Sequence, residues 1–175
     1  FVEERFGGTD ILVNNAGVSG NGPTLEVSDA EWKRAMSIDV DGVFYCSREA
    51  GRSMVRRGSG VIVNIGSIYS IVAAPNRASY CTSKAGVAML TRSLAVEWAS
   101  SGVRVNCIAP GYADTALLQA LAAEGKIDLA ALIKRTPSGK LTQPEDVAEV
   151  VGFLCDPRSK HITGQVLAVD GGWSA

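Results

Sequence analysis

Three residues that can move protons occur close together in the middle of the chain. They are Ser67, Tyr80 and Lys84, in the spacing Ser-x12-Tyr-x3-Lys. Tyr80 and Lys84 are four positions apart in a stretch rich in helix-forming residues, which predicts that they share one face of a helix. A nearby ammonium favours the phenolate, so we expect Lys84 to lower the pKa of Tyr80 from its ordinary value near ~10. Tyr80 could then exchange a proton with an alcohol or a ketone.

Ser67 follows the apolar run Val61–Ile65, which is typical of a buried strand. Because Ser67 follows this strand, we expect its hydroxyl at the carboxyl end of the strand. That end of a parallel sheet is where α/β proteins bind their ligands. Taken singly, the three residues could also be a turn former, a packing tyrosine and a solvated helix lysine. Their conjunction favours the catalytic interpretation.

Further motifs accompany this triad in a fixed order. They are Asp10-Ile11-Leu12-Val13-Asn14-Asn15-Ala16-Gly17, Val103-Arg104-Val105-Asn106, Pro110-Gly111-x-x-x-Thr115, Thr163-Gly164 and Asp170-Gly171-Gly172. Together with the triad, these motifs resemble the short-chain dehydrogenase/reductase family, and the similarity extends from Asp10 to Trp173.

The resemblance implies an α/β fold, a Rossmann-like doubly wound parallel sheet, of which the chain carries the C-terminal part, about four strands of the usual seven. It implies a single domain over residues 1–175, incomplete at its N-terminus, with a substrate lid over residues 115–141. It further implies NAD or NADP as the cofactor, a small secondary alcohol or ketone as the substrate, and a homodimer or homotetramer.

The resemblance also assigns roles to residues. Tyr80 is implied to be the general acid and base, Lys84 to lower its pKa and contact the nicotinamide ribose, and Ser67 to orient the substrate oxygen. Asp39 stands where relatives commonly carry an asparagine in a water chain to the lysine; the alternative is a solvated helix carboxylate. The residues implied to contact the cofactor are Asn14, Ala16, Gly17, Tyr80, Lys84, Pro110, Gly111, Ala113 and Thr115.

The region before Asp10 contains no Gly-x-x-x-Gly-x-Gly turn of the kind that cradles a dinucleotide pyrophosphate. In the strand order of the family, the segment Ile11–Val13 would lie beside an absent strand, so we expect an open, apolar sheet edge there. Residues 1–175 alone are therefore expected to bind the dinucleotide poorly and to aggregate.

The rest of the pattern alternates strands and helices without internal repeats. Ser28 and Glu31 have the spacing of a capping box, at the start of an amphipathic stretch that continues to Val55. Gly125 separates two helical pieces within residues 115–141. Strands are expected at Ile11–Val13, Val61–Ile65, Val103–Ile108 and Gln165–Val169, and helices at Phe1–Phe6, Ala78–Ser100 and Pro144–Cys155.

The composition restricts the possible partners. The chain is 46% hydrophobic with a net charge of −1, so it has no basic surplus that would indicate nucleic acid binding. The four cysteines form no Cys-x-x-Cys pair and the single histidine, His161, is expected on a surface turn, so we expect packed, reduced thiols, no metal site and a cytoplasmic protein. No apolar run of about eighteen residues indicates a membrane span.

Three functions are compatible with these features: an NAD(P)-dependent oxidoreductase, which we favour; a non-catalytic scaffold or interaction protein; and a hydrolase with Ser67 as nucleophile. The hydrolase is disfavoured because no Gly-x-Ser-x-Gly elbow occurs and only His161 could serve as base. Sugar alcohols, 3-oxoacyl thioesters and steroids remain candidate substrates, although Asn76 and Arg77 favour a polar one. The apolar residues of the long helix either form a subunit interface or face the sheet; they are Ala85, Val87, Ala88, Leu90 and Leu94.

Overall fold

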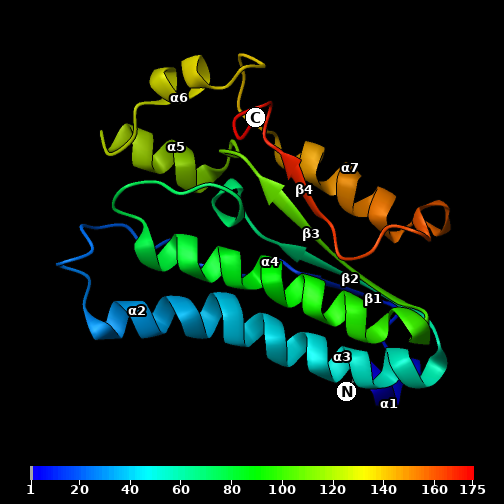
Figure 1. Cartoon of the computed structure of the whole chain (residues 1–175). Coiled ribbons are helices and arrows are strands. Elements are labelled where there is room, and N and C mark those ends of the chain that lie inside the picture. Colours follow the sequence, from blue (N-terminus) through cyan, green and yellow to red (C-terminus); the bar gives the residue numbers. More distant parts are fainter. Residues whose placement is uncertain (1) are drawn as a thin grey trace.

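A computed structural model describes residues 2–175 of the chain. Its centre is a parallel sheet of four strands in the order β1-β2-β3-β4, which confirms the predicted strand content and topology (Figure 1). The strands are β1 (Ile11–Asn14), β2 (Gly60–Ile65), β3 (Val103–Pro110) and β4 (Val166–Val169). Because all four run in the same direction, their carboxyl ends meet along one edge of the sheet.

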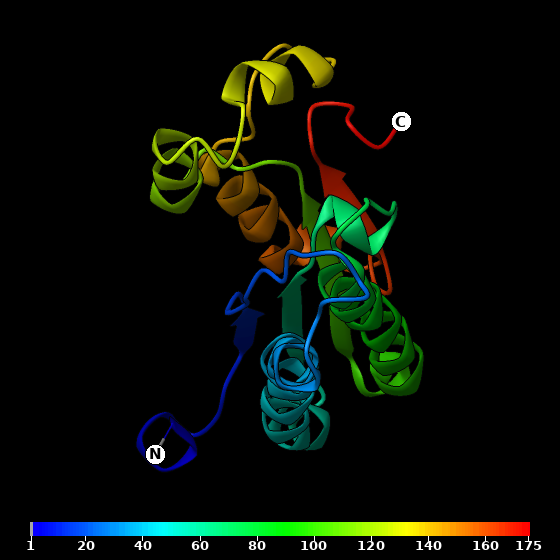
Figure 2. The same cartoon turned by 90° about the vertical axis from the view of Figure 1, so that its left-hand side faces the viewer.

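Helices cover both faces of the sheet, as a doubly wound fold requires (Figures 1 and 2). One face packs against α3 (Gly42–Arg57) and α4 (Ala78–Trp98), with α2 (Asp29–Met36) alongside them, and the other against α7 (Pro144–Cys155). Two short helices, α5 (Ala116–Ala123) and α6 (Leu129–Arg135), stand over the carboxyl ends of the strands. The prediction of a helix to Ser100 is nearly right, since α4 ends at Trp98 and a 3-10 turn continues to Ser101.

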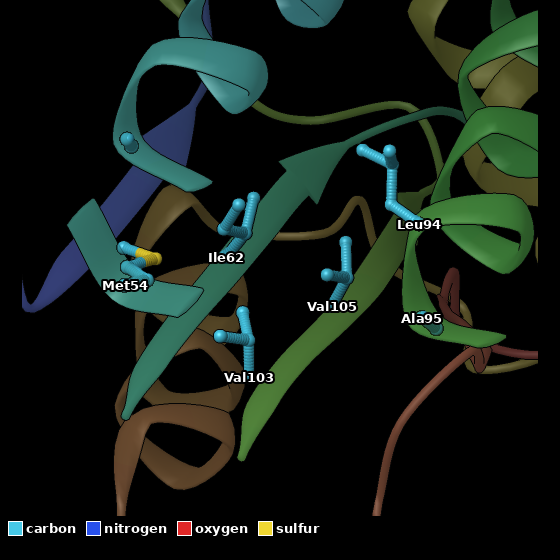
Figure 3. Close-up of a cluster of buried hydrophobic side chains, with 7 residues drawn as sticks. Met54, Ile62, Leu94, Ala95, Val103 and Val105 are labelled. Carbon is cyan, nitrogen blue, oxygen red and sulfur yellow. The ribbon is translucent and has the colours of Figure 1, made fainter. Parts of the chain in front are cut away.

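The alternation of side chains along the central strands places buried hydrophobic clusters on both faces of the sheet. Ile62 and Val105 point toward α3 and α4, where they pack with Met54 and Leu94 (Figure 3). Val63, the neighbour of Ile62, points to the opposite face and packs against α7. A strand buried on both faces therefore reads as a continuous apolar run, which is why Val61–Ile65 was recognisable in the sequence.

The helix ends agree with local signals in the sequence. Ser28 caps α2 and forms a capping box with Glu31, as predicted. Pro144 occupies the first turn of α7, where its missing N–H costs nothing. Gly58 ends α3 in the left-handed conformation, with a φ of 70°.

The amphipathic stretch from Trp32 to Val55 is not one regular helix. A π-helical turn, residues Ser37–Asp41, interrupts it between α2 and α3. Asp39 lies in this turn and is fully buried. The interpretation of Asp39 as a solvated helix carboxylate is therefore wrong, because amphipathic periodicity does not reveal a local widening of the helix.

β1 forms one edge of the sheet, and Ile11 and Val13 are 48% and 42% exposed. This confirms the predicted open, apolar edge. The short helix α1 (Val2–Phe6) precedes β1, has no buried residue, and stands apart from the other elements (Figure 2). The expected helix at Phe1–Phe6 is thus present from Val2 on, while Phe1 lies outside the described residues.

Within residues 2–175, no helix has the length and apolar character needed to cross a membrane. His161 lies on an exposed turn, as predicted. The expectation of packed thiols holds for Cys107, which is buried, but is wrong for Cys46, which lies exposed on α3.

Candidate active site

Ser67 lies directly beyond the carboxyl end of β2, as predicted. It begins a 3-10 turn, residues Ile68–Ser70, and its Oγ accepts a hydrogen bond from the Tyr69 N–H at 3.2 Å. The side chain of Ser70 donates to the Lys84 carbonyl at 2.9 Å, which ties this turn to α4. The Ser67 hydroxyl is consequently held at the strand edge with only 7% of the residue exposed.

Tyr80 and Lys84 lie one turn apart on α4, and their side chains meet. The Lys84 Nζ is 5.7 Å from the centroid of the Tyr80 ring and donates to the Ile65 carbonyl at 3.3 Å. Because Ile65 ends β2, this bond joins the helix to the strand that leads into Ser67. We call Ser67, Tyr80 and Lys84, the residues for which the sequence predicts a catalytic role, the catalytic floor.

The predicted effect of Lys84 on Tyr80 is wrong for this structure. Burial raises the pKa of Tyr80 above its ordinary value. A hydrogen bond from Ser67 and the positive charge of Arg77 lower this pKa, whereas the negative charge of Asp39 raises it further. Burial also lowers the pKa of Lys84, against the attraction of Asp39. Spacing along the helix revealed that the two groups would meet, but not that burial would be the largest influence on the pKa of the phenol.

Asp39 lies beneath the catalytic floor rather than in it. One carboxylate oxygen accepts from the Val18 N–H at 2.8 Å and the other from the Ser83 hydroxyl at 2.7 Å. A Cβ added to Gly17 would lie 3.2 Å from Asp39 Oδ1 and 3.0 Å from Lys84 Nζ. Asp39 therefore anchors the loop after β1 to α4 and acts on Tyr80 and Lys84 through its charge.

A cavity of about 510 Å³ opens above the catalytic floor. It brings together most of the residues proposed from the sequence, which come from the loops after β1 and β2, from α4, and from the end of β3 and the segment after it. The predicted site residues that line it are Gly17, Ser67, Tyr80, Lys84, Pro110, Gly111, Ala113 and Thr115.

Asn14, Ala16 and Asp39 do not line the cavity. Asn14 donates to Ser47 at 3.0 Å and to Asn64 at 2.8 Å, so its side chain links β1 to α3 and β2 in the interior. Its neighbour Asn15 lines the cavity instead.

The cavity residues fit the nicotinamide half of a dinucleotide. Gly17 and Gly111 present backbone without side chains, and a Cβ at Gly111 would meet the Asp170 Cα at 2.9 Å, so a side chain is excluded there by backbone. Lys84 and the Thr115 hydroxyl supply polar groups beside them. Bare backbone at the carboxyl ends of parallel strands is the kind of surface that a dinucleotide approaches closely.

An aromatic wall of the cavity was not predicted. The hydroxyls of Tyr69 and Tyr112 are 2.9 Å apart, and both residues line the cavity. The Tyr69 ring packs edge-on against Tyr80, with centroids 6.0 Å apart, and Tyr112 packs against Trp173 at 5.1 Å. A signal was present, because Tyr69 closely follows Ser67 and Tyr112 lies inside the Pro110-to-Thr115 motif, but single aromatic residues carry no periodic pattern.

Residues 115–141 extend over the cavity, and we call them the lid segment. Thr115 caps α5, Asp128 caps α6, and Gly125 lies between them with a φ of 69°. The segment contributes apolar residues to the cavity, namely Leu117, Leu118, Leu121 and Ile127. Its role in selecting substrate remains a prediction.

Comparison with known proteins gives consistent matches over the chain. A family model described as enoyl-(acyl carrier protein) reductase matches residues 1–174. A cis-4-hydroxycyclohexanecarboxylate dehydrogenase of Sinomonas cyclohexanicum is 47% identical, and a galactitol 2-dehydrogenase (L-tagatose-forming) of Cereibacter sphaeroides is 43% identical; each alignment covers 98% of this chain and 68% of the relative.

Among solved structures, a gluconate 5-dehydrogenase from Burkholderia cenocepacia in complex with NADP and tartrate has a TM-score of 0.93 and 38% identity. The match covers 99% of this chain and 68% of that one. The chain thus spans about two thirds of the length of the proteins that it resembles.

Proposed function

Because the chain belongs to the short-chain dehydrogenase/reductase family, we propose that Ser67, Tyr80 and Lys84 carry out its NAD(P)-dependent interconversion of a secondary alcohol and a ketone. The observation that supports these roles is the convergence of the three side chains on one cavity, from two elements that hydrogen bonds tie together. Bound NADPH or NADH supplies the hydride.

The chain's own groups handle the proton and the oxygen. The Ser67 hydroxyl orients the substrate oxygen next to the Tyr80 phenol. In reduction, Tyr80 donates its proton to the oxygen; in oxidation, it takes the proton back. Burial favours the protonated phenol, so reduction has its acid ready at neutral pH, whereas oxidation should rise toward alkaline pH. Lys84 and the backbone at Gly17 and Gly111 would hold the nicotinamide ribose.

The alternative functions receive less support. A scaffold has no need of a phenol and an ammonium buried together beside a cavity, since burial without a function costs stability. For a hydrolase, Ser67 would need a base, but His161 lies outside the cavity on an exposed turn.

We also propose a cytoplasmic homo-oligomer. The apolar residues of α4 that were considered for an interface mostly face the interior, since Val87, Ala88 and Leu94 are buried. The exposed apolar residues lie elsewhere on α3 and α4, at Phe44, Tyr45, Met89 and Val96. Burial of this surface against a second copy would remove it from water, and sedimentation of the complete protein tests this.

Isotope transfer tests the proposed activity. The complete protein is incubated with cyclohexanone and with NADPH or NADH that carries deuterium at the transferred position of the nicotinamide. We expect deuterium at the carbinol carbon of the product. A scaffold would leave the ketone unchanged, and that result would contradict the proposal.

A further inference from the structure

Among residues 2–175, the cavity is lined by two cationic side chains and no acidic one. The cations are Lys84, in the catalytic floor, and Arg77, three residues before Tyr80. Asp39 approaches Lys84 from below, where it offsets the ammonium charge. Arg77 is therefore the cation of the cavity whose charge no neighbouring carboxylate compensates.

The contacts of Arg77 hold it in place without neutralising it. Its Nη1 donates to the Asn21 side-chain oxygen at 2.6 Å, and its Cζ lies 5.5 Å from the centroid of the Tyr69 ring. Within the described chain, no carboxylate forms an ion pair with it. A guanidinium carries five N–H donors, so several remain for a ligand after the bond to Asn21.

The phenols of Tyr69 and Tyr112 add neutral donors to the same wall. Their hydroxyls share one hydrogen bond, so the phenol that accepts it keeps its own proton for another acceptor. Burial raises the pKa of Tyr69, which keeps that phenol uncharged. A cation and an uncharged O–H donor side by side form a surface that an anionic oxygen acceptor would match.

We propose that the substrate is a hydroxy or oxo acid, and that Arg77, with the phenol pair of Tyr69 and Tyr112, binds its carboxylate. This inference rests on the proposed function, since the carbonyl of the same molecule must reach the catalytic floor. The Tyr69 ring contacts both Tyr80 and Arg77. Because Arg77 and Tyr80 contact the same ring, one compact molecule can reach both the guanidinium and the catalytic floor.

A matched pair of ketones tests the charge requirement. The complete protein reduces 4-oxocyclohexanecarboxylate or its neutral carboxamide, and the ratio of the two kcat/KM values is measured. We expect the ratio to favour the acid by about ten- to a hundredfold, the range that a charged hydrogen bond contributes. Arg77→Gln should bring the ratio near one, mainly by raising KM for the acid. Arg77→Lys should give an intermediate ratio, because the positive charge remains while the planar guanidinium with its several N–H donors is lost.

Arg56→Gln is the matched control. Arg56 is exposed at the end of α3 and does not line the cavity, so this variant removes the same charge and should keep the wild-type ratio. A wild-type ratio near one, or an equal loss of preference in the Arg56 variant, would overturn the proposal.

A binding experiment separates this inference from the proposed function. Cyclohexanecarboxylate and cyclohexanecarboxamide cannot be reduced at the ring, and their affinities for the complete protein with NADP are measured by calorimetry. We expect Arg77→Gln to weaken carboxylate binding at least about tenfold relative to the carboxamide. This result would support the carboxylate site even if no ketone were reduced. Equal binding of both compounds by wild type would refute the site even if cyclohexanone were reduced.

Discussion

The catalytic floor and the lid segment line the same cavity but are built in contrasting ways. Ser67 and Lys84 are buried, and hydrogen bonds join their elements into one unit. The lid segment contains two short helices whose residues are mostly exposed; Leu118 is the one buried residue of α5 and α6 together, and Thr136 and Leu141 are buried where the segment returns to the body of the fold. Elements with few buried contacts open at low free energy. The residues proposed to carry out the reaction thus lie on well-buried elements, while the contacts expected to select the substrate lie on a segment with few buried residues.

The largest effect should come from the floor itself. Tyr80→Phe removes the phenol hydroxyl and keeps the ring that packs against Tyr69. We expect turnover to fall by at least about a thousandfold while dinucleotide binding is nearly unchanged. Steady-state rates and a fluorescence titration of NADPH measure the two quantities. A variant that kept a tenth of the wild-type rate would remove Tyr80 from the mechanism.

Lys84→Met keeps the stem and deletes the charge of the second floor residue. We expect kcat/KM to fall about a hundredfold, chiefly through weaker cofactor binding. The pH at which alcohol oxidation rises should change little, since burial dominates the pKa of Tyr80 and Arg77 is a cation that lowers it. If alcohol oxidation in Lys84→Met rose only at clearly higher pH than in wild type, Lys84 would be the group that lowers the pKa of Tyr80.

Substitutions of Asp39 test whether the buried carboxylate beneath the catalytic floor contributes to stability and activity. Asp39→Leu leaves the Val18 N–H without its acceptor, so we expect a loss of about 2 kcal/mol in stability and about tenfold in activity. Asp39→Asn keeps the shape, because Ser83 can donate to the Tyr80 carbonyl, 3.0 Å away, and accept from the new amide.

In Asp39→Asn the removal of the negative charge lowers the pKa of Tyr80, which Asp39 raises. Oxidation should therefore begin at lower pH than in wild type. Thermal unfolding and pH–rate profiles of both variants check these outcomes. If Asp39→Leu and wild type had the same turnover rates from pH ~6 to ~9, Asp39 would have no influence on catalysis.

The smallest effect is expected in the lid segment. Leu117 lines the cavity but is 65% exposed, so Leu117→Ala should change stability by no more than about 0.5 kcal/mol. Its kcat/KM should change about threefold to tenfold, and differently for different ketones. Ile133→Ala on α6 is the control, because Ile133 does not line the cavity. Equal effects of both variants on every ketone would argue against a selecting role for Leu117.

The fold was largely predictable because buried strands, caps and turns leave local signals. The runs at Ile62 and Val105, the capping box at Ser28 and the proline at Pro144 all mark elements that the structure confirms. In the site, residue types and spacing predicted the group Ser67, Tyr80 and Lys84, which the structure brings together at one cavity. The sequence did not reveal what depends on distant packing: the raised pKa of Tyr80, the burial of Asp39 in a π turn, and the interior role of the Asn14 side chain.

The contrast between floor and lid is the claim on which this account depends, and amide hydrogen exchange on the complete protein tests it most directly. We predict that the amides of β2 and of α4 around Lys84 exchange at least about tenfold more slowly than those of α5 and α6. Saturation with NADP and a substrate acid should slow exchange in the lid segment more than in the floor. Equal protection of lid and floor in the free protein would contradict the account.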